Sequence, residues 1–185
     1  FQLAIEFELD LDIHVDENGN EESKGLLHIS DAAIRNNYKG QIVCGHCCSL
    51  AAQTAENLEI MLQAAKRANI TIVSLPMVNQ WLQNRCELGE KTPRRRGIPL
   101  LKEITTRNIP VCLASDNIRD QFYGYGDLDM LEVFRLSVFI AHLDRPSLGD
   151  WPKAVTTTPA QAMGIGETHG LLKAVSYTHL RAHET

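Results

Sequence analysis

Residues that bind metals or move protons follow the predicted strands of this chain. His14 stands at the end of one predicted strand, His46 just past the next, and Asp116 just past a later one. Parallel α/β folds place their chemistry at the carboxyl ends of strands, and imidazole and carboxylate groups suit zinc or ferrous iron. Taken singly, each residue is more often a helix cap or an ordinary satisfied polar group. Their recurrence at equivalent places favours a shared metal site.

Glu17 follows His14 by three residues, where the chain turns over the mouth of the strand. A carboxylate there can face a metal-bound water without ligating the metal, as a general acid and base. Taken alone, Glu17 reads as a solvated acid in the polar run 16–19. Its closeness to His14 makes it the candidate proton carrier.

The elements that must position these residues are read from hydrophobic periodicity. Strands are predicted over residues 9–15, 41–45, 70–75 and 110–114, helices over 26–37, 51–68, 97–108, 127–142 and 150–163, and a long polar loop over 77–96. The strand centres lie 30, 29 and 40 residues apart, with a helix in each interval. This predicts an α/β fold with a parallel sheet, either open and doubly wound or part of a barrel. No glycine-rich phosphate-binding motif follows any strand, which disfavours nucleotide-binding folds.

Composition excludes several classes of function. The 185 residues carry a net charge of −5 and are 44% hydrophobic, as in an ordinary globular domain. A mildly acidic chain disfavours nucleic-acid partners, and no apolar run approaches the roughly 18 residues of a membrane span. No signal peptide is expected. Five cysteines, an odd number with three in one short stretch, predict reduced thiols and a cytoplasmic location.

Two further motifs compete with the metal site. Cys44 and Cys47 form a CxxC pair, which would allow thiol–disulfide exchange, although Cys47 and Cys48 also suit small apolar packing positions. The basic segment 92–97 is either a solvated loop or a lid that attracts anionic or polar substrates.

Several segments in register resemble the bacterial cytosine deaminases of the amidohydrolase superfamily. The resemblance covers roughly residues 8–165 and is carried by LDIHVDE at 11–17, GH at 45–46, PMVN at 76–79 with LQ and R at 82, 83 and 85, PRRRG at 93–97, and LASD at 113–116 with Asp120 and Gly126. Several motifs in order are far more specific than any one of them.

This resemblance implies a metal-dependent (β/α)8 barrel flanked by a small β-sandwich. His14 would be the fifth-strand metal ligand, Glu17 would shuttle a proton between water and a ring nitrogen, and His46 would orient the water. Asp116 would ligate the metal and accept a proton. The chain would then be a partial barrel, approximately strands 5 to 8 with their helices, over residues 1–165. Residues 166–185 would begin a flanking segment, and 176–185 would be a tail that comes from sequence contamination and does not belong to the family.

Departures from the family pattern leave the substrate open. Asn117 stands where a carboxylate is frequent, Phe122 where a tryptophan caps the pocket, and both are predicted to bind substrate. The expected activity is hydrolytic deamination of cytosine or a related aminated ring, with one divalent metal, iron or zinc. Triazines and creatinine-like rings are alternatives. The expected partner is a small nucleobase-like molecule, and homo-oligomerisation stays open.

The family's first-strand HxH ligand pair does not occur in this sequence. We therefore expect a C-terminal half of the barrel that is inactive alone. The competing hypotheses are a non-catalytic half-barrel and a thiol–disulfide oxidoreductase.

Overall fold

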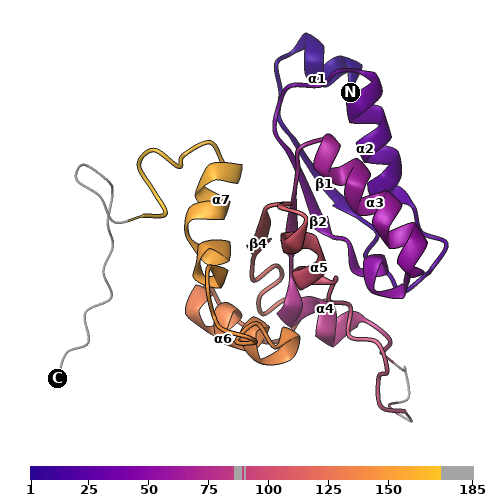
Figure 1. The fold of residues 1–185 in the computed structure, drawn as a ribbon. Coiled ribbons are helices and arrows are strands. Elements are labelled where there is room, and N and C mark those ends of the chain that lie inside the picture. Colours follow the sequence, from indigo (N-terminus) through magenta and orange to yellow (C-terminus); the bar gives the residue numbers. More distant parts are fainter. Residues whose placement is uncertain (86–88, 90, 172–185) are drawn as a thin grey trace.

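A four-stranded parallel sheet organises the computed structural model (Figure 1), which describes residues 1–85, 89 and 91–171. Its strands are β1 (Leu11–Val15), β2 (Ile42–His46), β3 (Ile70–Ser74) and β4 (Val111–Leu113). They pair in the order β1-β2-β3-β4, so each strand lies beside its neighbour in sequence. An α/β fold with a parallel sheet is confirmed. The sequential order has none of the reversal that marks a doubly wound sheet, and it is the order that a barrel requires.

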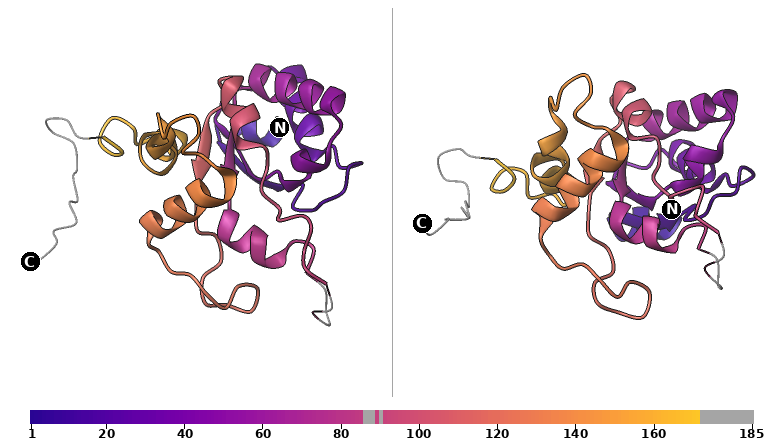
Figure 2. Two further views of the ribbon diagram at one scale, coloured as in Figure 1. Left: turned by 60° about the horizontal axis from the view of Figure 1, so that its bottom comes forward. Right: turned by 90° about the horizontal axis from the view of Figure 1, so that it is seen from below.

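Helices fill the intervals between the strands and continue after β4. They are α1 (Gln2–Glu6), α2 (Gly25–Arg35), α3 (Ala55–Arg67), α4 (Pro76–Leu82), α5 (Leu101–Thr106), α6 (Met130–Ala141) and α7 (Thr157–Ala162), with 3₁₀ turns η1 (Cys48–Ala52) and η2 (Trp151–Val155). In Figure 2, α2 and α3 lie together over the first strands, whereas α6 and α7 lie near β4. No helix in the described part of the chain has the length and hydropathy of a membrane span.

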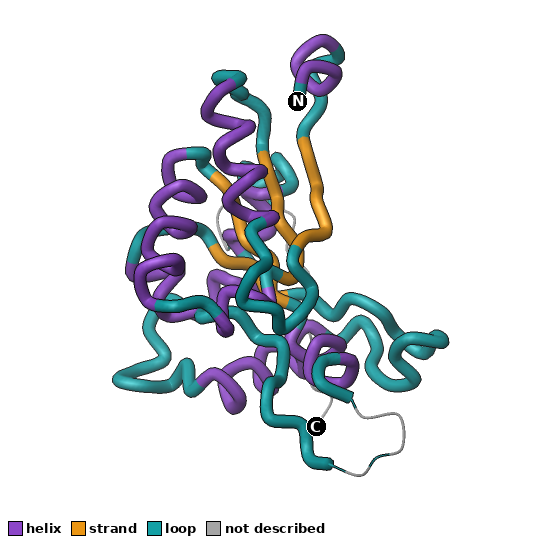
Figure 3. The backbone as a smooth tube through the Cα atoms, turned by 90° about the vertical axis from the view of Figure 1, so that its right-hand side faces the viewer, coloured by secondary structure: helices purple, strands orange, loops and turns teal. Residues whose placement is uncertain are grey.

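Helices lie along one side of the sheet (Figure 3). The hydrophobic core is made of buried side chains from both layers. Ile70 and Ile72 of β3 are fully buried, and Met61, Leu62 and Ala65 on α3 form a matching buried stripe at helical spacing. Thr54 caps the start of α3, its hydroxyl accepting the Asn57 N–H at 3.2 Å, so this helix has both a cap and an apolar face. Burial of these side chains holds the strand ends in place.

The predicted loop over 77–96 is wrong in its first part, where the structure has helix α4. Pro76 occupies the first turn, in which its missing N–H costs nothing and its fixed φ suits a helix. The segment looks like a loop in sequence because it carries polar residues such as Asn79, Gln80 and Gln83. Asn79 is nevertheless fully buried, where its side chain contacts Glu17 from the loop after β1 and His46 from the end of β2.

Other boundaries also differ from the predictions. The helix predicted over 51–68 begins later, after the 3₁₀ turn η1, and the helical piece predicted over 150–163 divides into η2 and α7. The helix predicted over 97–108 is shorter, and α1 was not predicted. Division of the chain at residue 165 stays a prediction, and the tail 176–185 lies outside the described residues.

Candidate active site

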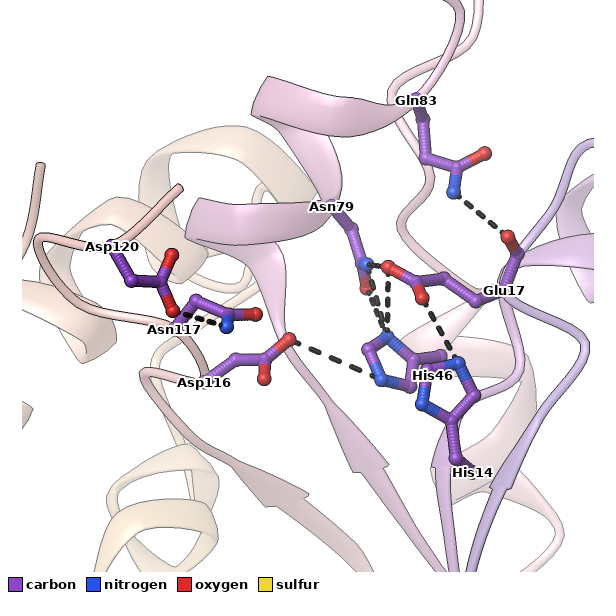
Figure 4. A network of polar contacts seen from close by, with 8 residues as sticks. All are labelled: His14, Glu17, His46, Asn79, Gln83, Asp116, Asn117 and Asp120. Carbon is purple, nitrogen blue, oxygen red and sulfur yellow. Dashed lines mark hydrogen bonds and ion pairs between the residues drawn. The ribbon is translucent and has the colours of Figure 1, made fainter. Parts of the chain in front are cut away.

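The candidate site lies at the carboxyl ends of the strands (Figure 4). His14 is next to last in β1, His46 is the last residue of β2, and Asp116 follows β4. Glu17 stands in the loop after β1, and Asn79 on α4 follows β3. Four parallel strands thus deliver polar side chains to one edge of the sheet, as parallel α/β folds do.

Glu17 bridges the two histidines. Its Oε2 lies 2.9 Å from Nε2 of His14, and its Oε1 lies 3.4 Å from Nδ1 of His46. The two imidazole rings lie 4.1 Å apart between centroids. The Glu17 side chain is one-fifth exposed and His46 is buried, whereas His14 is 64% exposed. The cluster therefore combines a protected carboxylate with one ring open to solvent.

Asp116 approaches the cluster from the opposite side. Its Oδ2 lies 3.9 Å from Nε2 of His46, so the contact that joins Asp116 to the cluster runs through His46. The sequence-predicted residues His14, Glu17, His46 and Asp116 therefore lie in one group. Their chemical roles stay predictions.

The direction of the His46 ring depends on a local departure from strand geometry. In the β1–β2 register, Val15 pairs with His46 and His14 pairs with Gly45, so simple alternation would point the two histidines to opposite faces. His46 has a φ of 72°, in the left-handed region that non-glycine residues rarely adopt. This turn brings its ring beside His14. Asp116 also has a left-handed φ, of 63°, and such backbone strain gathers at functional sites.

Asp16 fixes the loop that carries Glu17. Its two carboxylate oxygens accept the backbone N–H groups of Gly25 and Leu26 at 3.1 and 3.0 Å, where α2 begins. Its carbonyl accepts the Ser49 N–H at 3.2 Å from the neighbouring unit. A side chain at position 25 would come within 2.5 Å of the Asp16 carboxylate, so glycine is required there. The Glu17 loop is thereby tied to both flanking units.

Asn79 of α4 and Gln83, the residue that follows α4, hold Glu17 and were not predicted as site residues. The Asn79 side-chain amide donates to Glu17 Oε1 at 2.8 Å, and Gln83 donates through Nε2 to the Glu17 carbonyl at 3.1 Å. They stand four residues apart and so share one helix face. The signal that could have found them is their place in the PMVN and LQ segments of the resemblance.

The predicted substrate-binding residues Asn117 and Phe122 lie in the loop after β4. Asn117 donates to the Asp120 carboxylate at 2.6 Å, and Asp120 also accepts the backbone N–H of Phe122 at 2.9 Å. Hydrogen bonds lower the pKa of the Asp120 carboxyl. The largest cause is the bond from the backbone N–H of Tyr123, and the bond from the Asn117 side chain comes next. The Phe122 side chain is half exposed. Substrate contact by either residue stays a prediction.

Burial dominates the electrostatics of His46 and of the cysteines. Desolvation lowers the pKa of His46 against the opposing pull of the Glu17 charge, and the neighbouring His14 lowers it further. Desolvation also raises the pKa of Cys44 to about 12 and that of Cys47 well above its ordinary value. A thiol redox centre needs an accessible thiolate, so the environment of this CxxC pair opposes the oxidoreductase hypothesis.

The donor set suits a divalent metal ion. Ligand atoms of His14, Glu17 and His46 lie within 4.8 Å of one another, and imidazole with carboxylate is a combination that zinc and ferrous iron accept. The sequence prediction paired His14 with Asp116 as ligands and made Glu17 the proton carrier. The structure adds Glu17 and His46 as candidate donors beside His14.

The basic segment contacts the Glu17 loop beside a cavity of about 510 Å³, which it lines together with Asn18 and Gln83. The Arg95 guanidinium donates to the Gly19 carbonyl, and Arg96 donates to Gln80 at 3.2 Å. The segment is therefore attached to α4 and to the loop after β1, and its role as a lid stays a prediction.

Replacing Gly97 with alanine is expected to lower turnover by the full-length protein about tenfold and to destabilise it by about 1–3 kcal/mol. Gly97 has a φ of 69°, and an added Cβ would lie 2.9 Å from Gln83 Cβ and 3.1 Å from Asn79 Cβ, the two residues that hold Glu17. Turnover and thermal unfolding check the prediction. Gly89→Ala is the matched control, since Gly89 has a φ of 65° with nothing within 4 Å of its added Cβ. Equal losses of turnover and stability in the two variants would show that backbone strain is the cause, and not the contact of the added Cβ with Asn79 and Gln83.

The chain is similar in sequence to known proteins. The model of the amidohydrolase family matches residues 1–175. The chain is 46% identical over 156 residues to a pterin deaminase of Rhizobium rhizogenes, covering 84% of this chain and 35% of that protein. It is 25% identical over 172 residues to the N-isopropylammelide isopropyl amidohydrolase of Pseudomonas sp., covering 92% and 39%.

One solved structure is similar to almost the whole chain in fold. The 5-methylcytosine deaminase of Klebsiella pneumoniae, liganded with phosphonocytosine, superimposes with a TM-score of 0.84 at 26% identity. The match covers 94% of this chain and 42% of that one. The chain thus spans well under half the length of the relatives that it matches.

Proposed function

The chain belongs to the amidohydrolase family, and we propose that the protein is a metal-dependent hydrolytic deaminase of an aminated nitrogen heterocycle. The observation that supports this most is the cluster of His14, Glu17 and His46 at the strand ends, with Asp116 beside it. The relatives named for deamination act on pterin and on 5-methylcytosine. The family resemblance alone pointed to cytosine, whereas the 46% identity makes a pterin-like ring the first substrate to test.

The residues divide the work of the proposed reaction. Water adds to the ring carbon that bears the amino group, the C–N bond breaks, and ammonia leaves while the carbon becomes a carbonyl. A bound divalent ion, iron or zinc, would lower the pKa of this water, and His14 and Asp116 are the ligands that the resemblance implies. Glu17 takes a proton from the water and delivers it to the adjacent ring nitrogen. His46 orients the water by a hydrogen bond. Asp116 accepts the second proton of the water and passes it to the amino group, which leaves as ammonia.

Ammonia release by the full-length, metal-loaded protein tests this proposal. The substrates are pterin, cytosine, 5-methylcytosine, an alkylaminotriazine and creatinine. We expect ammonia from at least one aminated ring, loss of the activity on chelation, and recovery on adding zinc or iron. Alkylamine release from the triazine without ammonia from any ring would instead support the alternative represented by the Pseudomonas relative. No release from any of the five would favour the non-catalytic half-barrel.

A further inference from the structure

Asn79 occupies the centre of the site although the proposed chemistry gives it no task (Figure 4). It is fully buried on α4, and its side chain lies between Glu17 and His46. A buried primary amide needs partners for both of its N–H bonds. Those partners determine the orientation of the amide and, through it, the position of a proton on His46.

The contact with Glu17 fixes the orientation of the amide. The Asn79 nitrogen Nδ2 lies 2.8 Å from Glu17 Oε1. A carboxylate oxygen only accepts hydrogen bonds, so the amide atom that faces it must be the nitrogen donor. The reversed amide would place two oxygens against each other in a buried site.

The contact with His46 then fixes the position of a proton. The same Nδ2 lies 3.0 Å from Nδ1 of His46, closer than the amide oxygen at 3.4 Å. Glu17 Oε1 also lies 3.4 Å from Nδ1, so both oxygens near this ring nitrogen are farther from it than the amide nitrogen is. With one amide hydrogen on Glu17, the other is available to Nδ1, and the shortest contact makes Nδ1 its acceptor. A neutral imidazole that accepts at Nδ1 carries its hydrogen at Nε2, and Nε2 is the atom that faces Asp116 at 3.9 Å.

The backbone around Asn79 makes this amide a rigid support. Its N–H donates to the Leu75 carbonyl at 3.0 Å, and its own carbonyl accepts the Gln83 N–H at 2.9 Å. Gln83 in turn holds the Glu17 carbonyl. Asn79 and the residue that follows α4 thus hold both the side chain and the backbone of the proposed proton carrier.

We propose that Asn79 is a positioning residue whose two amide hydrogens hold the Glu17 carboxylate and set the Nε2–H tautomer of His46. Its effect on turnover rests on the proposed function, whereas its effect on the tautomer does not. With Nε2 protonated, His46 is not a metal ligand at that atom, which agrees with the ligand pair His14 and Asp116 of the proposed function. His46 then presents a donor toward Asp116 and toward the place where the water would be oriented. When a catalytic histidine is held in the wrong tautomer, the kcat of the enzyme can fall by about 10⁴-fold.

The test uses the full-length protein with ¹⁵N-labelled histidine, in wild-type, Asn79→Ala and Asn79→Asp forms. Imidazole ¹⁵N shifts report which ring nitrogen is protonated, and the His46 signal is the one that His46→Gln removes. We expect wild-type His46 to be protonated at Nε2 and both Asn79 variants to lose this preference. With the substrate that is turned over, kcat should fall about 10²-fold or more while KM stays within about threefold.

Ser137→Ala is the control for a merely structural loss. Ser137 is fully buried on α6, where its hydroxyl donates to the Val133 carbonyl of the same helix at 2.7 Å. If Asn79→Ala keeps the wild-type tautomer, or lowers kcat no more than Ser137→Ala at the same loss of stability, the proposal is wrong. If the wild type turns over no ring, the proposed function fails, and the ¹⁵N comparison still decides the role of Asn79.

Discussion

Replacing Glu17 with glutamine in the full-length protein is expected to lower kcat by about 10²- to 10⁴-fold, the usual contribution of a general acid–base group. Glutamine keeps the size of the side chain and one oxygen that Asn79 can bond, but an amide cannot carry a proton between water and a ring nitrogen. Steady-state turnover together with the bound metal per protein measures the effect.

The metal content of this variant separates two roles for Glu17. A loss of turnover with full metal content supports the proton carrier inferred from the resemblance. A parallel loss of metal supports the ligand role that its closeness to His14 and His46 allows. Glu21→Gln is the matched control, because Glu21 is an exposed glutamate of the same loop. If Glu17→Gln keeps turnover within threefold of the Glu21→Gln protein, neither role is right.

The sheet was predictable because its signals are local. Three of the strands are short runs of apolar, often β-branched residues, such as Ile70 to Val73, and β1 alternates apolar with polar residues. A helical period follows each of the first three strands before the next one. Such patterns depend on which face of a segment is buried, and burial follows hydrophobicity along the chain. The positions of His14, Glu17 and Asp116 at strand ends followed from these boundaries.

The parts that were missed depend on contacts between distant residues. α4 read as a loop because Asn79 and Gln83 are polar, but their partner Glu17 lies more than sixty residues away in sequence. The ring direction of His46 depends on one left-handed backbone angle, which a strand pattern does not encode. Secondary-structure propensity and hydrophobic periodicity describe neighbouring residues only, so they predict neither effect. Tertiary context overrides them.

The division of labour between ligands and proton carriers is the point on which sequence and structure differ most. The resemblance made His14 and Asp116 ligands of one metal. The structure gathers donor atoms of His14, Glu17 and His46, and it links Asp116 to this group through His46. Both arrangements use His14, so His14 is the residue whose removal must affect metal binding under either one.

Replacing His14 with alanine is therefore expected to reduce metal affinity by more than the roughly 10- to 100-fold that loss of an outer hydrogen-bond partner costs, with turnover falling in proportion. The side chain is 64% exposed, so the substitution leaves little cavity in the core and the fold should persist. Elemental analysis after dialysis, metal titration and turnover check this. His28→Ala is the matched control, because His28 is an exposed histidine on α2.

Asp116→Ala, measured alongside, identifies the second ligand, because a loss of metal equal to that of His14→Ala supports the pair implied by the resemblance. If the Asp116→Ala protein retains its metal and the His14→Ala protein loses it, the result supports ligation by the group formed with Glu17 and His46. Full metal content in the His14→Ala protein would show that the metal site lies elsewhere.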